Sequence, residues 1–283
     1  MQVTTLGTTW WGAELNSSAF LVEFDDSHIL FDCGKGATEG VQRAGTSLAD
    51  VSHLFFTHHH WDHNMDVVHF VGAGWQLGRA APLEVYGPHG IGDYPGTEAF
   101  LEGLFGRRGL WAMDIANRLW GQAGSLAPEG ILVHGHDIRE AGHVCEIGGA
   151  QISAISVVHM EDIPSFAFRI DAPSGSVVIT GDTVKLDSVV AFAKAADILI
   201  HDCTGTHDWL KQYGEEFNDG VWYHSSARQV GEVAAAARVK KVVAAHLAPP
   251  LVNEEGHSAI RAEIAESFGG EIFVAADGLT IRS

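Results

Sequence analysis

The chain has 283 residues, of which 46% are hydrophobic and 19% charged, a composition that excludes a disordered or low-complexity chain. Its 36 acidic and 17 basic residues give a formal net charge of −19, which disfavours a long nucleic acid as partner unless the surface is locally basic. The first residues lack a basic segment followed by an apolar one, and no apolar run approaches the length of a membrane span. Cys33, Cys145 and Cys203 are an odd number at wide spacing, typical of reduced thiols. We therefore expect a cytoplasmic protein with no membrane contact.

Short apolar runs rich in β-branched residues predict strands along the whole chain. In chain order these are 19–23, 29–32, 53–57, 83–86, 151–158, 165–170, 177–180, 198–200, 242–245 and 272–274. Helical periodicity predicts helices at 62–71, 97–120, 186–195, 225–237 and 258–267. This order predicts an α/β protein, a mixed sandwich of two sheets with helices packed outside. Nothing marks a domain boundary, so we expect a single domain over 1–283 with a helical insertion at about 97–122.

The strongest functional signal is the segment Thr57-His58-His59-His60-Trp61-Asp62-His63, an HxHxDH pattern at the end of a predicted strand. His58 and His60 are alternate residues of an extended segment, so their side chains can point to the same side. Asp62 and His63 follow as the predicted helix begins and turn back toward them. One turn can therefore supply ligands to two metal ions.

Further residues of the metal-ligand type follow other predicted strands, namely His159, Asp182 and His246. A single histidine after an apolar strand is more often a hydrogen-bonded core residue than a ligand. The repetition of this arrangement after the HxHxDH segment favours the ligand interpretation, because a preorganised metal site requires ligands on rigid strand ends.

In chain order, Asp32, the HxHxDH segment, His159, Asp182 and His246 resemble the pattern of the metallo-β-lactamase superfamily. Within it, FDCGKG at 31–36, LIHDCT at 199–204 and YHSSA at 223–227 are similar to the FDCGEG, LIHEAT and GHSTA segments of the ribonuclease Z group. The likeness spans nearly the whole chain. It implies an αββα sandwich of two mixed sheets with outer helices, and a metal-dependent hydrolase.

The resemblance also implies a role for each matching residue. One ion would be held by His58, His60 and His159, the other by Asp62, His63 and His246, with Asp182 bridging them. Imidazole and carboxylate ligands suit two divalent ions, with zinc expected and manganese or iron as alternatives. Asp32 would orient a ligand histidine through its other ring nitrogen, the alternative being a turn or capping residue.

Two divalent ions lower the pKa of a bridging water and clamp the oxygens of an in-line displacement. In the ribonuclease Z-like arrangement, Asp62 also accepts the proton of the attacking water. His224, paired with Asp202, would then donate a hydrogen bond or a proton to the phosphoryl oxygens or the leaving group. The structural alternatives are an exposed acid at a strand end for Asp202 and a helix-capping segment for His224.

Departures from the ribonuclease Z pattern bear on the substrate. Asp202 stands in place of glutamate and Tyr223 in place of glycine, and His59 and Trp61 occupy variable positions of HxHxDH where a small residue is common in that group, so we expect a smaller or more aromatic pocket. Trp222, two positions before His224, is the tryptophan expected to contact substrate. The basic arm that grips transfer RNA in that group has no evident counterpart, because 97–120 is apolar-rich.

These features favour a phosphodiesterase that acts on a small or cyclic phosphodiester through a metal-bridged hydroxide. A lactonase or carboxylic ester hydrolase on the same scaffold is the alternative, and a transfer RNA 3′ processing endonuclease is less favoured. A non-catalytic binding subunit is disfavoured because every ligand position is filled. The expected partner is a small-molecule substrate. The sequence leaves two roles open for the 97–122 insertion, a lid over the site or a contact in a homodimer.

Overall fold

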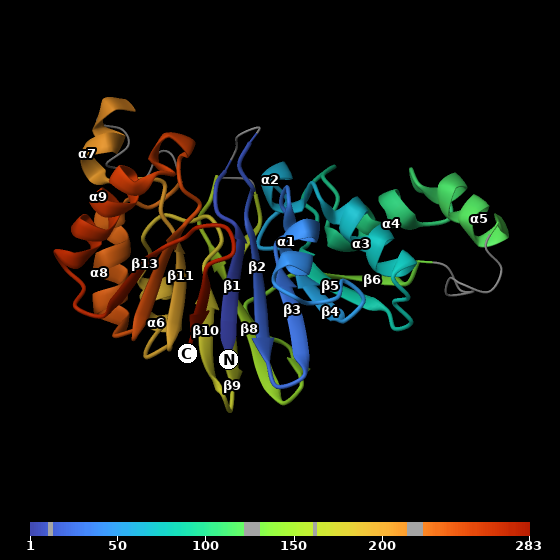
Figure 1. Cartoon of the computed structure of the whole chain (residues 1–283), viewed down its shortest axis with the longest axis horizontal. Coiled ribbons are helices and arrows are strands. Elements are labelled where there is room, and N and C mark those ends of the chain that lie inside the picture. The colour runs from blue at the N-terminus through green and yellow to red at the C-terminus, as the bar shows by residue number, and fades with distance from the viewer. Residues whose placement is uncertain (11–13, 122–130, 161–162, 214–222) are drawn as a thin grey trace.

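The computed structural model describes residues 1–10, 14–121, 131–160, 163–213 and 223–283, which form two seven-stranded sheets packed face to face (Figure 1). The first sheet has the order β14-β1-β2-β3-β4-β5-β6 and the second β13-β12-β11-β10-β9-β8-β7. The strands of the first are β1 (Gln2–Gly7), β2 (Ala19–Phe24), β3 (Ser27–Phe31), β4 (Val51–Phe55), β5 (Leu83–Pro88), β6 (Val133–Ile138) and β14 (Thr280–Arg282). Those of the second are β7 (Gly142–Ile147), β8 (Ala150–Val157), β9 (Ser165–Ala172), β10 (Gly175–Ile179), β11 (Ile198–Asp202), β12 (Lys241–Ala245) and β13 (Glu271–Val274).

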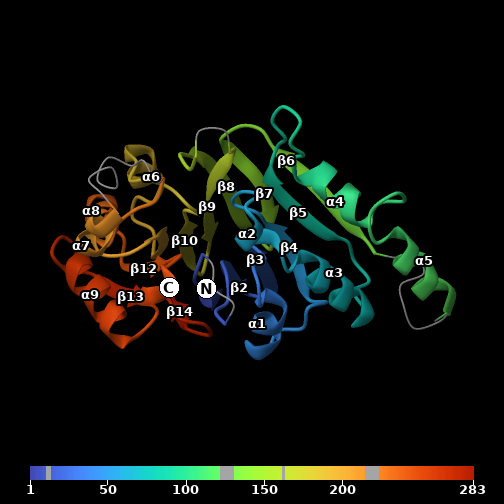
Figure 2. The ribbon, with the colours of Figure 1, turned by 90° about the horizontal axis from the view of Figure 1, so that it is seen from above.

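Helices cover the outer faces of both sheets, as the view from above shows (Figure 2). The first sheet carries α1 (Ala37–Arg43), α2 (Trp61–Asn64), α3 (Val67–Gln76), α4 (Thr97–Phe105) and α5 (Ala112–Gly121). The second carries α6 (Asp187–Phe192), α7 (His207–Leu210), α8 (Ala227–Ala237) and α9 (Glu254–Ala265), with 3₁₀ turns at Lys211–Tyr213 and Pro249–Leu251. Among the helices in the described part of the chain, none has the length and apolarity needed to span a membrane. The expected αββα sandwich is therefore confirmed.

The central core lies between the sheets and contains aromatic side chains from both. The Phe31 and Phe55 rings stack with centroids 4.9 Å apart, and Phe55 meets Phe168 of the other sheet edge to face at 5.4 Å. Their neighbours Leu30 and Leu54 point the other way, into the layer of helices. Because these strands are buried on both faces, they read in the sequence as continuous apolar runs rather than as alternating ones.

The predicted strands are all present, but the sequence reasoning missed β1, β6, β7, β14, α1 and α7. The β6 and β7 segments, VHGHDI and GHVCEI, are rich in glycine and polar residues and lie at sheet edges, so they lack the apolar signal of a central strand. The predicted helix 97–120 is wrong as one element, because it is two helices separated at 106–111. Similarly, the predicted helix 62–71 is α2 followed by α3.

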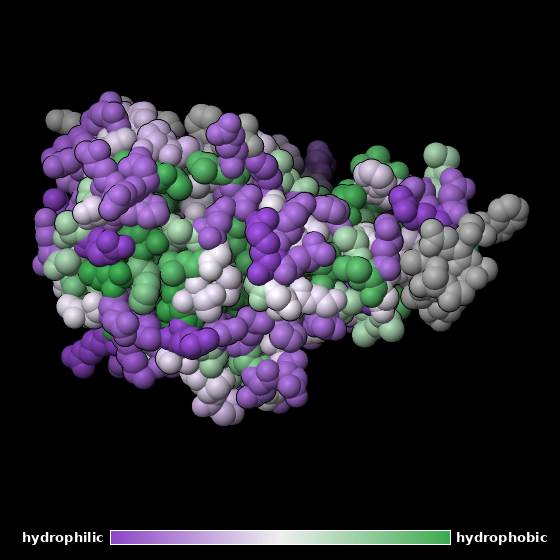
Figure 3. All heavy atoms as spheres, viewed as in Figure 1, coloured by the Kyte–Doolittle hydropathy of each residue, from purple (hydrophilic) through white to green (hydrophobic). Residues whose placement is uncertain are grey.

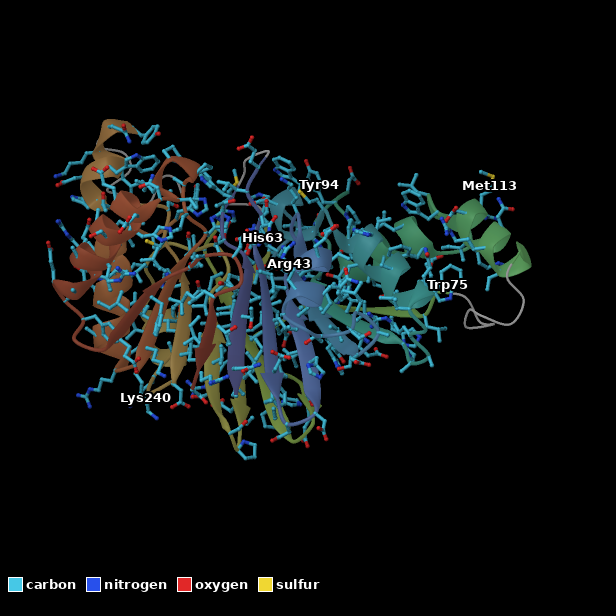
Figure 4. All side chains as sticks on the ribbon, viewed as in Figure 1. Arg43, His63, Trp75, Tyr94, Met113 and Lys240 are labelled. Carbon is cyan, nitrogen blue, oxygen red and sulfur yellow. The ribbon has the colours of Figure 1, made fainter. Side chains whose placement is uncertain are left out.

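The surface differs from one end of the molecule to the other. Hydrophilic residues dominate the region of α7 and α9, at the upper left of the space-filling view (Figure 3). At the opposite end, α5 projects from the body, and Met113 on it is 78% exposed (Figure 4). The cysteines Cys33, Cys145 and Cys203 are free thiols, as expected.

Strand direction brings several carboxyl-terminal strand ends to one edge of the sandwich. The pairs β3 with β4, β10 with β11 and β11 with β12 are parallel. The β8 strand runs the same way as β10, because each pairs antiparallel with β9. Residues that directly follow these strands therefore lie close together at this one edge of the sandwich.

Candidate metal centre

The seven proposed ligands lie at this edge, on loops contributed by both sheets. The first sheet supplies the segment 58–63 after β4, and the second supplies His159 after β8, Asp182 after β10 and His246 after β12. His63, labelled at the upper centre, marks the place in the sandwich (Figure 4). Every proposed ligand except His60 is buried.

The structure gathers these side chains into two groups of donor atoms. His58, His60, His159 and Asp182 offer atoms that all lie within 4.8 Å of one another, and so do Asp62, His63 and His246. A third group with the same spacing joins Asp182 and His246 to Asp202 and His224. Within the first group, His60 Nδ1 lies 3.1 Å from His159 Nε2, and within the second, His246 Nε2 lies 3.3 Å from Asp62 Oδ2.

Asp182 lies between the two groups. Its Oδ2 atom is 3.7 Å from His58 Nε2 and 3.6 Å from His159 Nε2 on one side. On the other side it is 3.4 Å from His63 Nε2 and 3.2 Å from His246 Nε2. A single carboxylate oxygen that faces four imidazoles in this way is the arrangement expected of a bridging ligand.

The residues fit metal ions on two grounds. His58 Nε2 is buried and has no hydrogen-bond partner in the part of the chain that the structure describes, so it is a free donor aimed into the cluster. A buried nitrogen of this kind is costly unless a partner completes it. The ion pairs of Asp182 are with histidines only, so no lysine or arginine among the described residues neutralises it.

The pKa shifts of two of the histidines also favour a bound cation. Burial, assisted by the neighbouring His63, holds the pKa of His58 well below its usual value, which keeps this ring neutral and able to bind a metal. Burial opposes a charge on His63 too, but the carboxylates of Asp182 and Asp32 hold its pKa well above the usual range. The cluster therefore attracts positive charge at the point where His63 Nε2 and Asp182 meet.

Asp32 and Thr57 hold the histidines from behind. Asp32 is fully buried, and its Oδ2 accepts a hydrogen bond of 2.7 Å from His63 Nδ1. Its Oδ1 accepts from the Thr57 backbone N–H at 2.8 Å, and the Thr57 hydroxyl lies 3.1 Å from His58 Nδ1. The contact of Asp32 with a ligand histidine was expected from the sequence, whereas the role of Thr57 was missed. Such contacts fix the ring orientation of a ligand histidine.

Close backbone packing keeps the HxHxDH turn in place against the second sheet. The Phe166 N–H donates to the Thr57 carbonyl at 2.9 Å. Gly181, which precedes Asp182, has φ of 59°, and a Cβ atom there would lie 2.6 Å from the Thr57 Cβ. Only glycine permits both this conformation and this approach, so Gly181 sets the distance between Asp182 and the turn.

We expect Asp32→Asn to weaken metal binding by roughly 10- to 100-fold, the range typical of residues that orient a ligand. Asparagine keeps the shape of the side chain and tolerates the φ of 55° at this position, so the fold should persist. The check is competitive titration with a chelator, with circular dichroism as the test of folding. Unchanged affinity would show that Asp32 is only a turn residue.

His224 and Asp202 form a pair beside the metal ligands. Asp202 ends β11, and its Oδ2 accepts a hydrogen bond of 2.9 Å from His224 Nδ1. The backbone N–H groups of Thr183 and Ser225 donate to the same oxygen at 3.1 and 3.3 Å. Burial alone would lower the pKa of His224, but the carboxylate of Asp202 raises it to about 9. Asp202 therefore favours the protonated form of His224, whose Nε2 lies on the side of the ring away from Asp202.

A pocket of about 390 Å³ opens over the centre. Its walls combine metal-ligand residues with aromatic and apolar side chains, and the lining residues are Trp10, His60, Trp61, Asp62, His159, Met160, Asp182, Tyr223, His224 and His246. The expected aromatic character is present, but the sequence reasoning did not single out Trp10, whose position no local pattern reveals. Trp222, the tryptophan expected to contact substrate, lies outside the described residues.

Several residues around the pocket adopt a left-handed backbone conformation. The φ values are 55° for Asp32, 51° for Met160, 56° for Tyr223 and 61° for His246. At Tyr223 this conformation aims the backbone carbonyl at His159, whose Nδ1 donates to it at 3.0 Å. The glycine of the ribonuclease Z pattern at this position is thus replaced by a tyrosine that keeps a glycine-like backbone.

Comparisons with known proteins agree with this geometry. The family model described as the metallo-beta-lactamase superfamily matches residues 12–246. Ribonuclease Z of Mycobacterium bovis is 30% identical over 260 residues, covering 91% of this chain and 88% of that protein. Among solved structures, the metallo-beta-lactamase fold protein YhfI from Bacillus subtilis matches with a TM-score of 0.76 at 21% identity, covering 100% of this chain and 99% of the other. The short form of human tRNase Z matches with 0.71 at 19% identity, covering 99% and 98%.

The chain belongs to the metallo-β-lactamase superfamily and is a metal-dependent hydrolase. Within the superfamily it falls in the ribonuclease Z-like branch. The expectation that long nucleic acids are disfavoured as partners finds no support, because the curated relatives carry the name ribonuclease Z. Net charge is a property of the whole surface and does not describe a local groove.

Proposed function

We propose that the chain hydrolyses phosphodiesters with two divalent ions, held by the seven residues His58, His60, Asp62, His63, His159, Asp182 and His246. Zinc suits these imidazole and carboxylate donors best, with manganese and iron as alternatives. When bound, such ions supply a hydroxide nucleophile at neutral pH and neutralise charge on the phosphoryl oxygens. The other tasks of the reaction belong to side chains of the protein.

The observation that carries the proposal is the pair formed by His224, on the wall of the pocket, and the buried Asp202 that contacts it. Phosphodiester cleavage expels an alkoxide, which leaves far more readily when it is protonated. The carboxylate of Asp202 raises the pKa of His224 and so favours its protonated form, and His224 lines the same pocket as Asp62 and Asp182. A lactone or ester also expels an alkoxide, but only after a tetrahedral oxyanion that a metal can stabilise has formed, whereas the phosphodiester loses its alkoxide in the displacement itself.

Asp62 is suited to accept the proton of the attacking water. Burial would raise its pKa, but the hydrogen bond from His246 and the nearby charges of the histidines lower it below the usual value. The side chain therefore stays ionised at neutral pH. It lines the pocket together with His224, so the pocket holds both a proton acceptor and a proton donor.

The substrate has two candidate size classes. The aromatic pocket of about 390 Å³, with no lysine or arginine among its described lining residues, favours a small or cyclic phosphodiester. The 30% identity to a ribonuclease Z along 88% of that protein favours the 3′ end of an RNA such as a transfer RNA precursor. Both place the same phosphodiester chemistry at the same centre.

A substrate panel tests the proposal. We expect bis(p-nitrophenyl) phosphate to be cleaved faster than γ-butyrolactone or p-nitrophenyl acetate by protein reconstituted with zinc, manganese or iron(II). A transfer RNA precursor with a 3′ trailer and a 2′,3′-cyclic nucleotide, assayed in parallel, distinguish the two size classes. The Asp182→Ala protein, purified identically, controls for contaminating hydrolases. Efficient lactone opening without phosphodiester cleavage under any of the metals would favour the lactonase alternative.

A further inference from the structure

Part of the pocket wall has no role in holding metal or transferring protons. Trp10, Trp61, Met160 and Tyr223 contribute this part. Trp61 is 63% exposed and Met160 47% exposed, although tryptophan is among the more buried residue types on average. A large apolar side chain left open to solvent beside a reactive centre suggests that a ligand covers it.

Both tryptophans lie next to residues of the proposed reaction, Trp61 through its position in the sequence and Trp10 through ring packing. Trp61 is the first residue of α2 and lies between the proposed ligands His60 and Asp62 in sequence. Trp10 packs edge to face against His224, with ring centroids 5.9 Å apart. A flat group resting on these indoles would therefore lie next to the atoms that attack and protonate the substrate.

The charge of the pocket narrows the nature of that group. The described lining residues include no lysine or arginine, and the proposed role of the protonated His224 is at the leaving group, so no further cation in the lining would pair with a second phosphate or a carboxylate. The part of the substrate away from the scissile phosphate should thus be uncharged and flat. Aromatic side chains bind nucleobases by stacking, with little dependence on which base is present.

We propose that Trp61, assisted by Trp10, stacks the nucleoside base next to the scissile phosphodiester and is the residue that selects a nucleoside ester over a simple alkyl ester. This rests on the proposed phosphodiesterase function and deepens it. The base has two sources, a free dinucleotide or cyclic nucleotide and the 3′ segment of an RNA. Both present the same ring to Trp61.

The test compares two esters with one leaving group, thymidine 5′-(p-nitrophenyl phosphate) and methyl p-nitrophenyl phosphate. Wild-type protein should prefer the nucleoside ester in kcat/KM. Trp61→Leu, which keeps an apolar side chain but removes the ring, should reduce this preference by roughly 5- to 100-fold, mainly through KM. Trp61→Phe should retain most of it. Trp111→Ala, which removes a 43% exposed tryptophan from the wall of another pocket, is the matched control and should change neither ester.

The outcomes separate the stacking proposal from the function on which it rests. If wild-type protein hydrolyses both esters and Trp61→Leu leaves their ratio unchanged, stacking is wrong while the phosphodiesterase stands. If wild-type protein hydrolyses neither, the proposed function fails. In that case stacking is tested by calorimetry, which compares the affinities for thymidine 5′-monophosphate and ribose 5-phosphate. The stacking proposal is overturned if Trp61→Leu binds the nucleotide as tightly as the wild type does.

The source of the base is identified with natural substrates. A diadenosine monophosphate, a 2′,3′-cyclic nucleotide and a transfer RNA precursor are cleaved by wild-type protein and by Trp61→Leu in parallel. A loss confined to the small nucleotides or to the RNA identifies the source, and a loss on both supports a base subsite that serves either. A loss on neither overturns the proposal.

Discussion

Asp182→Ala is expected to abolish tight binding of both metal ions and to reduce hydrolysis by more than the roughly 10- to 100-fold seen for residues that only orient a ligand. The reason is the position of its Oδ2 atom, which faces His58 and His159 on one side and His63 and His246 on the other. Removal of this oxygen leaves two incomplete ligand sets and a cluster of imidazoles without its central negative charge. Metal analysis after reconstitution should give two ions per wild-type chain and fewer than one for the variant.

The matched control is Asp187→Ala. Asp187 is an exposed aspartate five positions after Asp182, at the start of α6. This variant should bind metal and turn over substrate as the wild type does. If Asp182→Ala still binds two ions tightly, Asp182 is not the bridging residue. If wild-type protein binds no zinc, manganese or iron, the metal centre itself is refuted.

His224→Ala is expected to lower turnover by roughly 10²- to 10⁴-fold, the range typical of a lost general acid, without any loss of metal. Donor atoms of His224 and Asp202 also lie within 4.8 Å of those of Asp182 and His246, but His224 Nδ1 is engaged by Asp202 at 2.9 Å, so we assign His224 to proton transfer rather than to metal binding. The defect should depend on the leaving group, because a departing p-nitrophenolate needs no proton whereas an alkoxide does. We therefore expect a large loss with a dinucleotide and a small one with bis(p-nitrophenyl) phosphate.

His143→Ala, which removes an exposed histidine on β7, is the control for a general effect of losing an imidazole. A His224→Ala defect of equal size on both kinds of leaving group would argue for a role in positioning substrate rather than in protonation. An unchanged rate on both would return His224 to the helix-capping interpretation, since Ser226, two residues on, caps α8.

The residues that gather at this edge of the sandwich were predictable because each one lies in a segment that directly follows a recognisable strand. The HxHxDH segment fixes its own geometry at a strand end, and the central strands are recognisable from their apolar runs. The resemblance alone implied that Asp32 orients one of the histidines, and the structure identifies that histidine as His63, at 2.7 Å. Edge strands such as β6 and β7 were missed because half-exposed edges tolerate polar residues and glycine.

Other features of the site depend on the fold and leave no mark in the sequence. The contact of Trp10 with His224 joins residues more than two hundred positions apart, and nothing in the Trp10 segment signals it. His59, at a variable position of HxHxDH, turns away from the metal ligands, and its Nε2 lies 2.9 Å from the Thr97 hydroxyl at the start of α4. Such long-range packing appears only when the strands are placed in space.

The left-handed backbone around the pocket has a consequence for how this protein can evolve or be engineered. Four of the seven non-glycine residues with positive φ in the described chain, Asp32, Met160, Tyr223 and His246, support or line the pocket. Each such residue costs about 1 to 3 kcal/mol unless its side chain is small or hydrogen-bonded locally. Substitutions that raise thermostability are therefore safest far from this pocket. Tyr223→Gly would relieve the cost of the left-handed backbone but would remove an aromatic side chain from the pocket wall.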